Sequence, residues 1–143
     1  MSDSIKTYAA RTYSTGTYGR AICNSRHHHF VADDVTVNEE VTAGEYFLAG
    51  ITACAVNLIG RVAKEDMEVS FERLEVKIKG TYDRDKQTNG MTLFQTVTMQ
   101  FEFNGINEHQ AHELVAIYQK RCPLYGTVAM ATPEVKIEVS VQP

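Results

Sequence analysis

The sequence has few cysteines, no CxxC pair and no long run of basic residues. Its 143 residues carry a formal net charge of −4 at pH 7, and the lysines and arginines are scattered along the chain. Contacts with phosphate groups need clustered lysine and arginine side chains, so we expect no nucleic-acid partner. The negative charge also disfavours attraction to an anionic membrane surface, so we expect no membrane partner.

The low cysteine count excludes two further classes of protein. There are three cysteines, at Cys23, Cys54 and Cys122. An odd and low number does not describe the disulfide framework of a secreted domain. Without a CxxC pair, one chain cannot build a four-thiolate zinc site. In a reducing compartment, such thiols are either buried filler or reactive groups, and we interpret Cys23, in a predicted strand, as filler.

A secretory signal is not visible either. The segment from Met1 to Lys6 is polar, and it lacks the charged start followed by an apolar stretch that such a signal requires. We therefore expect a cytoplasmic protein. The length suits one domain, and since no repeat, low-complexity segment or boundary is visible, we predict a single domain over residues 1–143.

The longest apolar stretch runs from Gly44 to Ala63 and is hydrophobic almost all round. Such a helix is buried in protein or crosses a membrane. A crossing needs about 20 mostly apolar residues, and here Glu45, Asn57 and Arg61 interrupt the stretch. We predict a central helix that is buried on most sides, with a partner subunit helping to cover it.

Strands are predicted on both sides of this helix. Before it, residues 20–23 and 28–32 are predicted strands, followed by a polar loop over 33–41. After it, residues 67–82 are a predicted long strand, with a β-bulge near Glu72–Arg73 where the apolar parity switches. The turn over 83–90 ends in Asn89-Gly90, a strong hairpin signal, so residues 91–104 should pair with that strand in antiparallel orientation.

The last third predicts two helices and a strand. Asn107 and Gln110 form a capping pattern ahead of an amphipathic face. The apolar positions of that face are Ala111, Leu114, Val115 and Tyr118. In the dipeptide Cys122-Pro123 the proline favours a first helical position, which places Cys122 at the N-cap of a second helix. The alternation over 135–141 predicts a closing strand.

The histidines invite a metal interpretation, which the spacing does not favour. In a strand, His27 and His29 share one face and His28 points to the other, which leaves two ligands at best. His109 and His112 are spaced to ligate from one helix but fall beside its polar face. We interpret both groups as solvated and expect no metal.

Two cysteine motifs carry a family resemblance. The segment from Glu45 to Cys54 resembles the helix of the OsmC/Ohr family that bears its first cysteine, and Arg121-Cys122-Pro123-Leu124 resembles the second-cysteine motif. The segment from His29 to Asp33, the closing strand and the order of elements also fit, so the resemblance covers roughly Arg20 to the C-terminus. It implies an α+β fold with antiparallel sheets around a buried central helix, in an intertwined homodimer.

The resemblance also implies a reaction and site residues. Cys54 takes the peroxidatic role and Cys122 the resolving role, in a thiol-dependent peroxidase that reduces organic hydroperoxides and is reset by an external dithiol, without metal or organic cofactor. From the residues alone, Cys122 at a helix start would be the more acidic thiol. The family's activating Arg comes from the N-terminal strands; Arg20 is the first choice here, and Arg11 and Arg26 compete.

The acid that holds this Arg is matched by Glu45 from its neighbourhood. In the best-defined peroxidases, however, the acid falls one position earlier, where Gly44 stands, and the preceding proline is absent. These departures, with the apolar surroundings of Cys54, leave an alternative open. The chain would then be a non-catalytic member of the family that binds small apolar ligands, or a stress-related protein.

Overall fold

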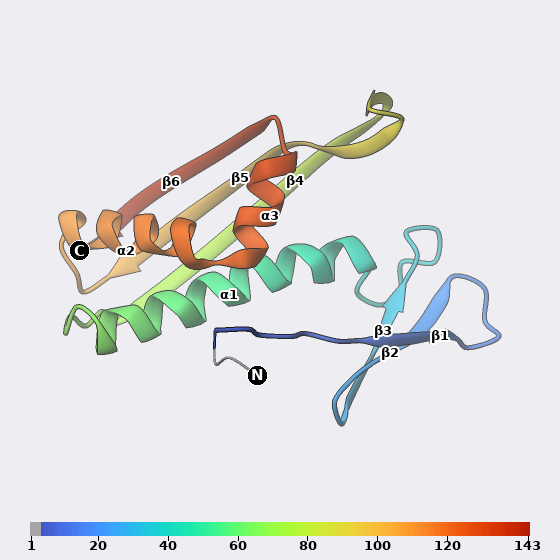
Figure 1. Ribbon diagram of the computed structural model, residues 1–143, viewed down its shortest axis with the longest axis horizontal. Coiled ribbons are helices and arrows are strands. Elements are labelled where there is room, and N and C mark those ends of the chain that lie inside the picture. Colours follow the sequence, from blue (N-terminus) through green and yellow to red (C-terminus); the bar gives the residue numbers. More distant parts are fainter. Residues whose placement is uncertain (1–3) are drawn as a thin grey trace. The chain divides into compact units, whose positions relative to one another are not determined.

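A computed structural model describes residues 4–143. The chain divides into two compact units, an N-terminal unit, Met1–Phe47, and a C-terminal unit, Leu48–Pro143 (Figure 1). Helix α1 (Ala43–Glu65) begins in the first unit and continues in the second. Two sheets and three helices make an α+β fold, as the sequence predicts.

The N-terminal unit is one antiparallel sheet with the strand order β1-β2-β3. Its strands are β1 (Arg11–Ser14), β2 (Arg20–Ser25) and β3 (His28–Asp33). The predicted strands and the loop after them are confirmed. The β2–β3 turn is tight, and Arg26 in it has a φ of 55°. Because of the antiparallel register, Arg20 lies directly opposite Asp33 at the far end of this hairpin.

The sheet of the C-terminal unit has the order β4-β5-β6, formed by β4 (Arg73–Thr88), β5 (Met91–Asn104) and β6 (Glu134–Gln142). β4 and β5 form the predicted antiparallel hairpin, and both residues of its Asn89-Gly90 turn have positive φ. β6, in contrast, pairs with β5 in parallel. The prediction of purely antiparallel sheets is therefore wrong for this strand. The physical reason is that a helical crossover connects β5 to β6, and such a crossover returns the chain in the parallel sense.

The segment between α1 and β4 also differs from the prediction. Residues 67–72 are not strand, because they wrap around the end of α1: Met67 N–H donates to the Val62 carbonyl and Val69 N–H to the Ala63 carbonyl. Glu68 has a φ of 52°, which turns the chain. No bulge is needed near residue 72; the irregular register lies instead between Thr81 and Gln87.

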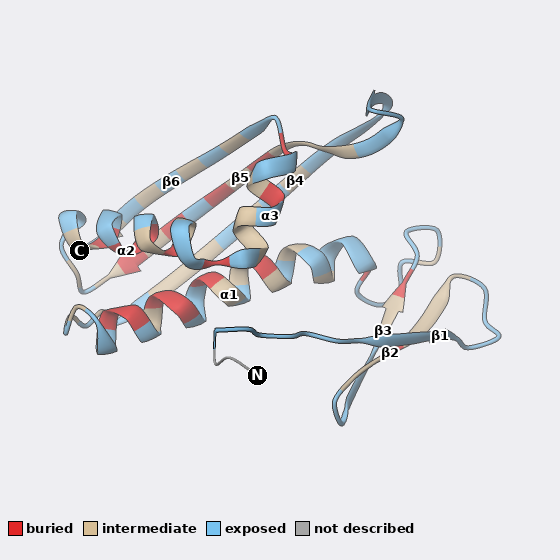
Figure 2. Cartoon of the chain, viewed as in Figure 1, coloured by how far each residue is buried: buried red, intermediate tan, exposed pale blue. Residues whose placement is uncertain are grey.

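The crossover contains α2 (Glu108–Arg121) and α3 (Pro123–Ala131). Asn107 caps α2 by accepting the Gln110 N–H at 2.8 Å, as predicted. The predicted apolar face is buried at all four positions. It packs in one core with one face of the sheet and with α1 (Figure 2). The opposite sheet face is polar, since alternate residues of a strand point to opposite sides.

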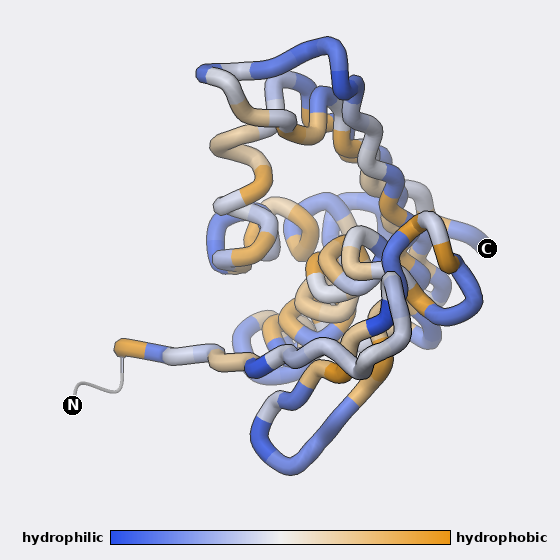
Figure 3. Tube along the Cα trace, turned by 90° about the vertical axis from the view of Figure 1, so that its right-hand side faces the viewer, coloured by the Kyte–Doolittle hydropathy of each residue, from blue (hydrophilic) through white to orange (hydrophobic). Residues whose placement is uncertain are grey.

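Helix α1 buries one stripe rather than most of its surface. The buried residues are Ile51, Ala55, Leu58, Ile59, Val62 and Ala63, while Phe47 and Val56 are exposed. By length and composition alone α1 could cross a membrane, but the core helix of a soluble protein passes the same test. Along the trace, hydrophobic residues are concentrated in helices and strands, and the connections are mostly hydrophilic (Figure 3).

Candidate functional site

Two cysteines meet inside the C-terminal unit. Cys54 lies on α1, and Cys122 lies at the junction where α2 ends and α3 begins. Their sulfur atoms are 2.7 Å apart, and both thiols are free. The two residues are 68 positions apart in sequence, so it is the packing of α1 against the crossover that brings them together.

The junction fixes Cys122 from both sides. Its backbone N–H donates to the Tyr118 carbonyl at 2.9 Å, which closes α2. Its Sγ accepts the Tyr125 N–H at 3.4 Å, which caps α3, and Pro123 occupies the start of that helix as predicted. Cys122 is only 2% exposed, whereas Cys54 is partly exposed. Reagents from solvent therefore reach Cys54 first.

The electrostatics of the pair are set by its dry surroundings. Burial raises the pKa of Cys54 to about 12, with further contributions from the hydrogen bond and the charge of Cys122. The charge of Arg61 acts in the opposite direction and lowers this pKa. Arg61 follows Cys54 by seven residues on α1, which places it about 10 Å further along the same side of the helix.

The sequence did not identify two of these neighbours as functional. Arg61 was interpreted only as an interruption of an apolar helix, although its spacing from Cys54 of two helical turns was visible. Tyr118 was predicted as part of the buried face of α2. The structure places its hydroxyl within 3.4 Å of the Ile51 carbonyl, one helical turn before Cys54.

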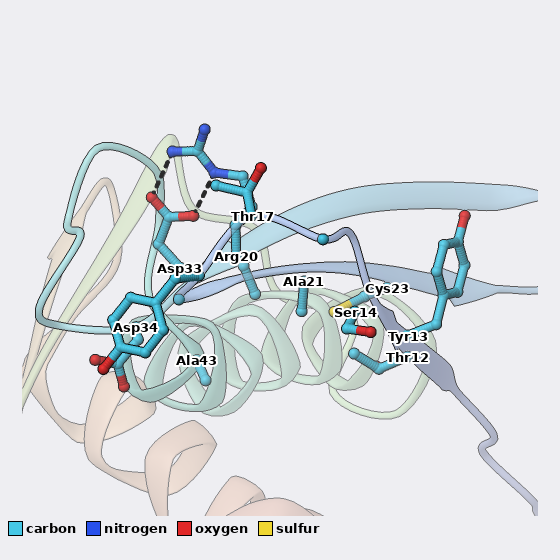
Figure 4. A pocket seen from close by; sticks show the side chains of 14 residues that line it. Thr12, Tyr13, Ser14, Thr17, Arg20, Ala21, Cys23, Asp33, Asp34 and Ala43 are labelled. Carbon is cyan, nitrogen blue, oxygen red and sulfur yellow. Dashed lines mark hydrogen bonds and ion pairs between the residues drawn. The ribbon is translucent and has the colours of Figure 1, made fainter.

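Arg20 is held in the N-terminal unit by two carboxylates. Its Nε and Nη2 donate to the two oxygens of Asp33 at 2.8 Å each (Figure 4). Nη2 also donates to Glu39 at 2.9 Å. These bonds raise the pKa of Arg20. The Arg20 guanidinium in turn holds the pKa of Asp33 well below its usual range, with help from the backbone N–H groups of Glu40 and Glu39.

Glu45 has a different partner. Its carboxylate accepts the Thr42 N–H at 2.9 Å and the Thr42 hydroxyl at 2.8 Å. These bonds lower its pKa, and together they cap the start of α1. Arg20 and Glu45 are thus each paired with residues other than one another. Of the competing arginines, Arg11 lies over the Tyr13 ring at 5.7 Å. The role of the activating cation stays a prediction.

A hollow of about 810 Å³ lies in the N-terminal unit and includes neither Cys54 nor Cys122. Its lining comes mostly from β1, β2 and the connections beside them, and includes Cys23, Arg20 and Asp33 (Figure 4). Within residues 4–143 no group of three or more metal-ligating side chains is arranged to hold an ion.

Comparisons with known proteins agree with this fold. A sequence model of the family described as OsmC-like protein matches residues 36–138. The structure superposes on an OsmC-like protein from Mycoplasma pneumoniae with a TM-score of 0.84 and 17% identity, over 96% of this chain and 99% of that one. A search of curated proteins gave no match.

Two further solved structures carry the name of organic hydroperoxide resistance proteins. The one from Elizabethkingia anophelis has a TM-score of 0.76 and 18% identity, over 99% of this chain and 100% of that one. The one from Bacillus subtilis has a TM-score of 0.68 and 20% identity, over 94% and 98%. At such identities these structures establish the fold.

Proposed function

Because the matched family model covers most of its residues, this chain belongs to the OsmC-like protein family, and we propose that it is a thiol-dependent peroxidase that reduces organic hydroperoxides. The observation that carries the proposal is the 2.7 Å separation of the Cys54 and Cys122 sulfur atoms. The names of the structural neighbours support the substrate class.

The reaction divides into two steps within the protein. The Cys54 thiolate attacks the O–O bond of the hydroperoxide, so that the alkoxide leaves and takes a proton to become the alcohol, and Cys54 becomes a sulfenic acid. The Cys122 thiolate then attacks the Cys54 sulfur, and the hydroxide leaves as water once protonated. The product is the Cys54–Cys122 disulfide. Since Cys122 already lies against Cys54, this second step needs little chain movement.

An external dithiol closes the cycle. One of its thiolates attacks the protein disulfide and forms a mixed disulfide, and its second thiol displaces the protein thiol. The reductant leaves as a disulfide, which balances the two electrons given to the hydroperoxide. Every atom that reacts is therefore supplied by two cysteines, the substrate and the dithiol.

The first step needs a positive charge near Cys54. Because burial raises the pKa of Cys54 to about 12, nearly all of this thiol is protonated at neutral pH. Arg61 supplies part of the required charge along α1. We propose that Arg20, held by Asp33 and Glu39, supplies the rest in the assembled protein, and that Glu45 fixes the start of the helix that bears Cys54.

The proposed assembly is a homodimer in the cytoplasm. Its support is the apolar surface that a single chain leaves exposed, which includes Phe47 and Val56 of α1 and Tyr8 and Tyr18 of the N-terminal unit. Exposed apolar surface of this kind is typical of an interaction site. The reducing cytoplasm would keep both thiols available between cycles.

One observation favours a second candidate, an OsmC-like protein that binds small apolar ligands without catalysis. The pKa of Cys54 is raised rather than lowered, which is the signature of a buried structural thiol. In this alternative the two cysteines are core residues. Titration with a thiol-blocking reagent separates the two functions, because only the peroxidase requires a thiol that reacts rapidly near neutral pH.

The test of the proposed function is consumption of cumene hydroperoxide by the purified protein with excess dithiol. We expect turnover well above that of the dithiol alone, and its loss in Cys54→Ser with the oligomeric state unchanged. Cys23→Ser is the matched control, because this buried thiol lies in the other unit. Full activity in Cys54→Ser would overturn the proposal, and turnover no faster than the free dithiol would favour the ligand-binding candidate.

A further inference from the structure

Tyr118 is a buried phenol beside the two sulfurs that the reaction scheme leaves unused. It is fully buried, and its ring packs against those of Phe101 and Tyr125, with centroids 5.6 and 5.4 Å away. A buried hydroxyl needs a hydrogen-bond acceptor. Its two acceptors are the Ile51 carbonyl at 3.4 Å and the Met99 thioether at 4.0 Å. Both distances are long, so neither acceptor holds the hydroxyl proton firmly.

The hydroxyl reaches α1 at Ile51, one helical turn before Cys54, whose sulfur lies 2.7 Å from that of Cys122. Tyr118 precedes Cys122 by one helical turn, and its backbone carbonyl accepts the Cys122 N–H at 2.9 Å. Burial raises the pKa of Tyr118 above its usual value, and the charges of Cys122 and then Cys54 raise it further. The phenol therefore stays protonated and lies within electrostatic reach of both sulfurs. A protonated phenol is a hydrogen-bond donor for a thiolate.

Access decides which sulfur is released when the disulfide is reduced. Cys54 is partly exposed and Cys122 is buried, so an incoming thiolate attacks Cys54. Cys122 then leaves with the electron pair of the S–S bond, as a thiolate in a dry environment. Such an ion needs donors, because an unpaired buried charge is costly. The Tyr125 N–H is one donor, at 3.4 Å from Cys122 Sγ.

We propose that the Tyr118 hydroxyl is the second donor, and that it turns from the Ile51 carbonyl to Cys122 Sγ whenever that sulfur carries a negative charge. Tyr118 is thus a positioning residue for the leaving thiolate, and this role rests on the proposed redox cycle of the cysteine pair. No electron passes through the phenol. The proton stays on the phenol oxygen as a hydrogen-bond donor until solvent protonates Cys122.

The test compares Tyr118→Phe with Tyr125→Phe. Both variants lose one hydroxyl from neighbouring rings, but the Tyr125 hydroxyl accepts from Gln119 at 2.9 Å, and the Tyr125 backbone donor to Cys122 remains. The disulfide is first formed with diamide, so that the test does not depend on peroxidase activity. Its reduction by dithiothreitol is then followed. A better leaving thiolate departs faster, so we expect reduction of Tyr118→Phe to be slower by roughly tenfold and reduction of Tyr125→Phe to be unchanged.

The pH profile of Cys122 gives a readout that a merely structural role would not move. In a Cys54→Ser background, alkylation of Cys122 by iodoacetamide should shift to higher pH, by about one unit, when Tyr118 becomes Phe. Equal reduction rates and equal pH profiles in folded variants would overturn the proposal. Should Tyr118→Phe fail to fold, the tyrosine absorption of the Cys54→Ser protein, which retains Tyr118, serves instead. It should change as Cys122 ionises in the Cys54→Ser protein, and a constant spectrum would be equally decisive against the proposal.

Discussion

Each of the two units of this chain is stabilised internally by a different kind of interaction. Among the described residues, the C-terminal unit contains a continuous apolar core that includes Phe101, Phe103 and Leu114. Within residues 4–47 of the N-terminal unit, Cys23 is the one buried apolar residue, and the polar Asp33 and Thr42 are buried with it. This unit is fixed by hydrogen bonds, of which those from Arg20 to Asp33 at 2.8 Å are the centre.

This difference explains why the cysteine pair lies in the C-terminal unit and the paired Arg20 in the N-terminal unit. The cysteine pair is in the unit with the dry core, where packing can hold two sulfurs at 2.7 Å. The same dryness raises the pKa of Cys54. The unit that holds an arginine between two carboxylates is the other one. The thiol pair and the paired arginine are therefore built in different units, and the proposed peroxidase reaction requires both.

The largest expected effect comes from breaking the core of the C-terminal unit. Phe101 is 1% exposed and Phe30 of the N-terminal unit is 37% exposed. We expect Phe101→Ala to lower the free energy of unfolding by about 3–5 kcal/mol, because a buried ring leaves a cavity. The same change at Phe30 should cost much less. Denaturant unfolding measures both, and equal losses would refute the contrast between the units.

A second change targets the polar unit. The bonds from Arg20 keep the pKa of Asp33 below that of an unfolded aspartate, near 3.9. The ionised carboxylate therefore stabilises the unit above that pH, and the stabilisation is lost as pH falls towards the depressed folded value. Asp33→Asn should remove this acid dependence and expose the backbone N–H groups of Glu39 and Glu40 to exchange.

Hydrogen exchange of the loop after β3 checks this prediction. Asp34→Asn is the matched control, because it removes one negative charge from the next residue in the sequence. The Asp34 carboxylate accepts hydrogen bonds from the Thr36 N–H and hydroxyl instead of from Glu39 and Glu40. In Asp34→Asn, exchange at Glu39 and Glu40 should stay close to that of the unchanged protein. The interpretation is wrong if both variants protect Glu39 and Glu40 equally well.

The smallest expected effect concerns the positive charge of Arg61 on α1, in the C-terminal unit. Arg61→Gln should raise the pKa of Cys54 further and slow its alkylation a few-fold, because a positive charge that favours the thiolate is lost. Lys64→Gln removes the same charge from the last turn of the same helix and should have a smaller effect. Alkylation rates against pH measure both, and identical profiles would exclude Arg61 from the site.

Local signals predicted much of the fold. The Asn107–Gln110 cap, the Asn89-Gly90 turn and the Cys122-Pro123 helix start each depend on a few adjacent residues, and each is confirmed. The parallel pairing of β6 was not predicted, because its partner strand β5 is distant in the sequence. The path of residues 67–72 around the end of α1 was not predicted either, because it depends on backbone hydrogen bonds that the alternation of apolar residues does not reveal.

Of the candidate site, only the two cysteines could be predicted from the sequence. The two cysteine motifs identified Cys54 and Cys122 through the family pattern, but no pattern gives the 2.7 Å between them. The partner of Arg20 was not predicted, because it depends on the β2–β3 register, which places Asp33 opposite. Tyr118 was predicted as core and is core; the contact of its hydroxyl with the Ile51 carbonyl depends on how α1 and α2 pack, which the sequence does not show.

The most direct test of the central claim is the intact mass of the protein after one equivalent of organic hydroperoxide. The unchanged protein should lose two hydrogen atoms as the Cys54–Cys122 disulfide forms. Cys122→Ser should gain one oxygen atom as the Cys54 sulfenic acid accumulates, and Cys54→Ser should keep its mass. An oxygen gained by Cys54→Ser as fast as by Cys122→Ser, or no change in any of the three proteins, would contradict the account.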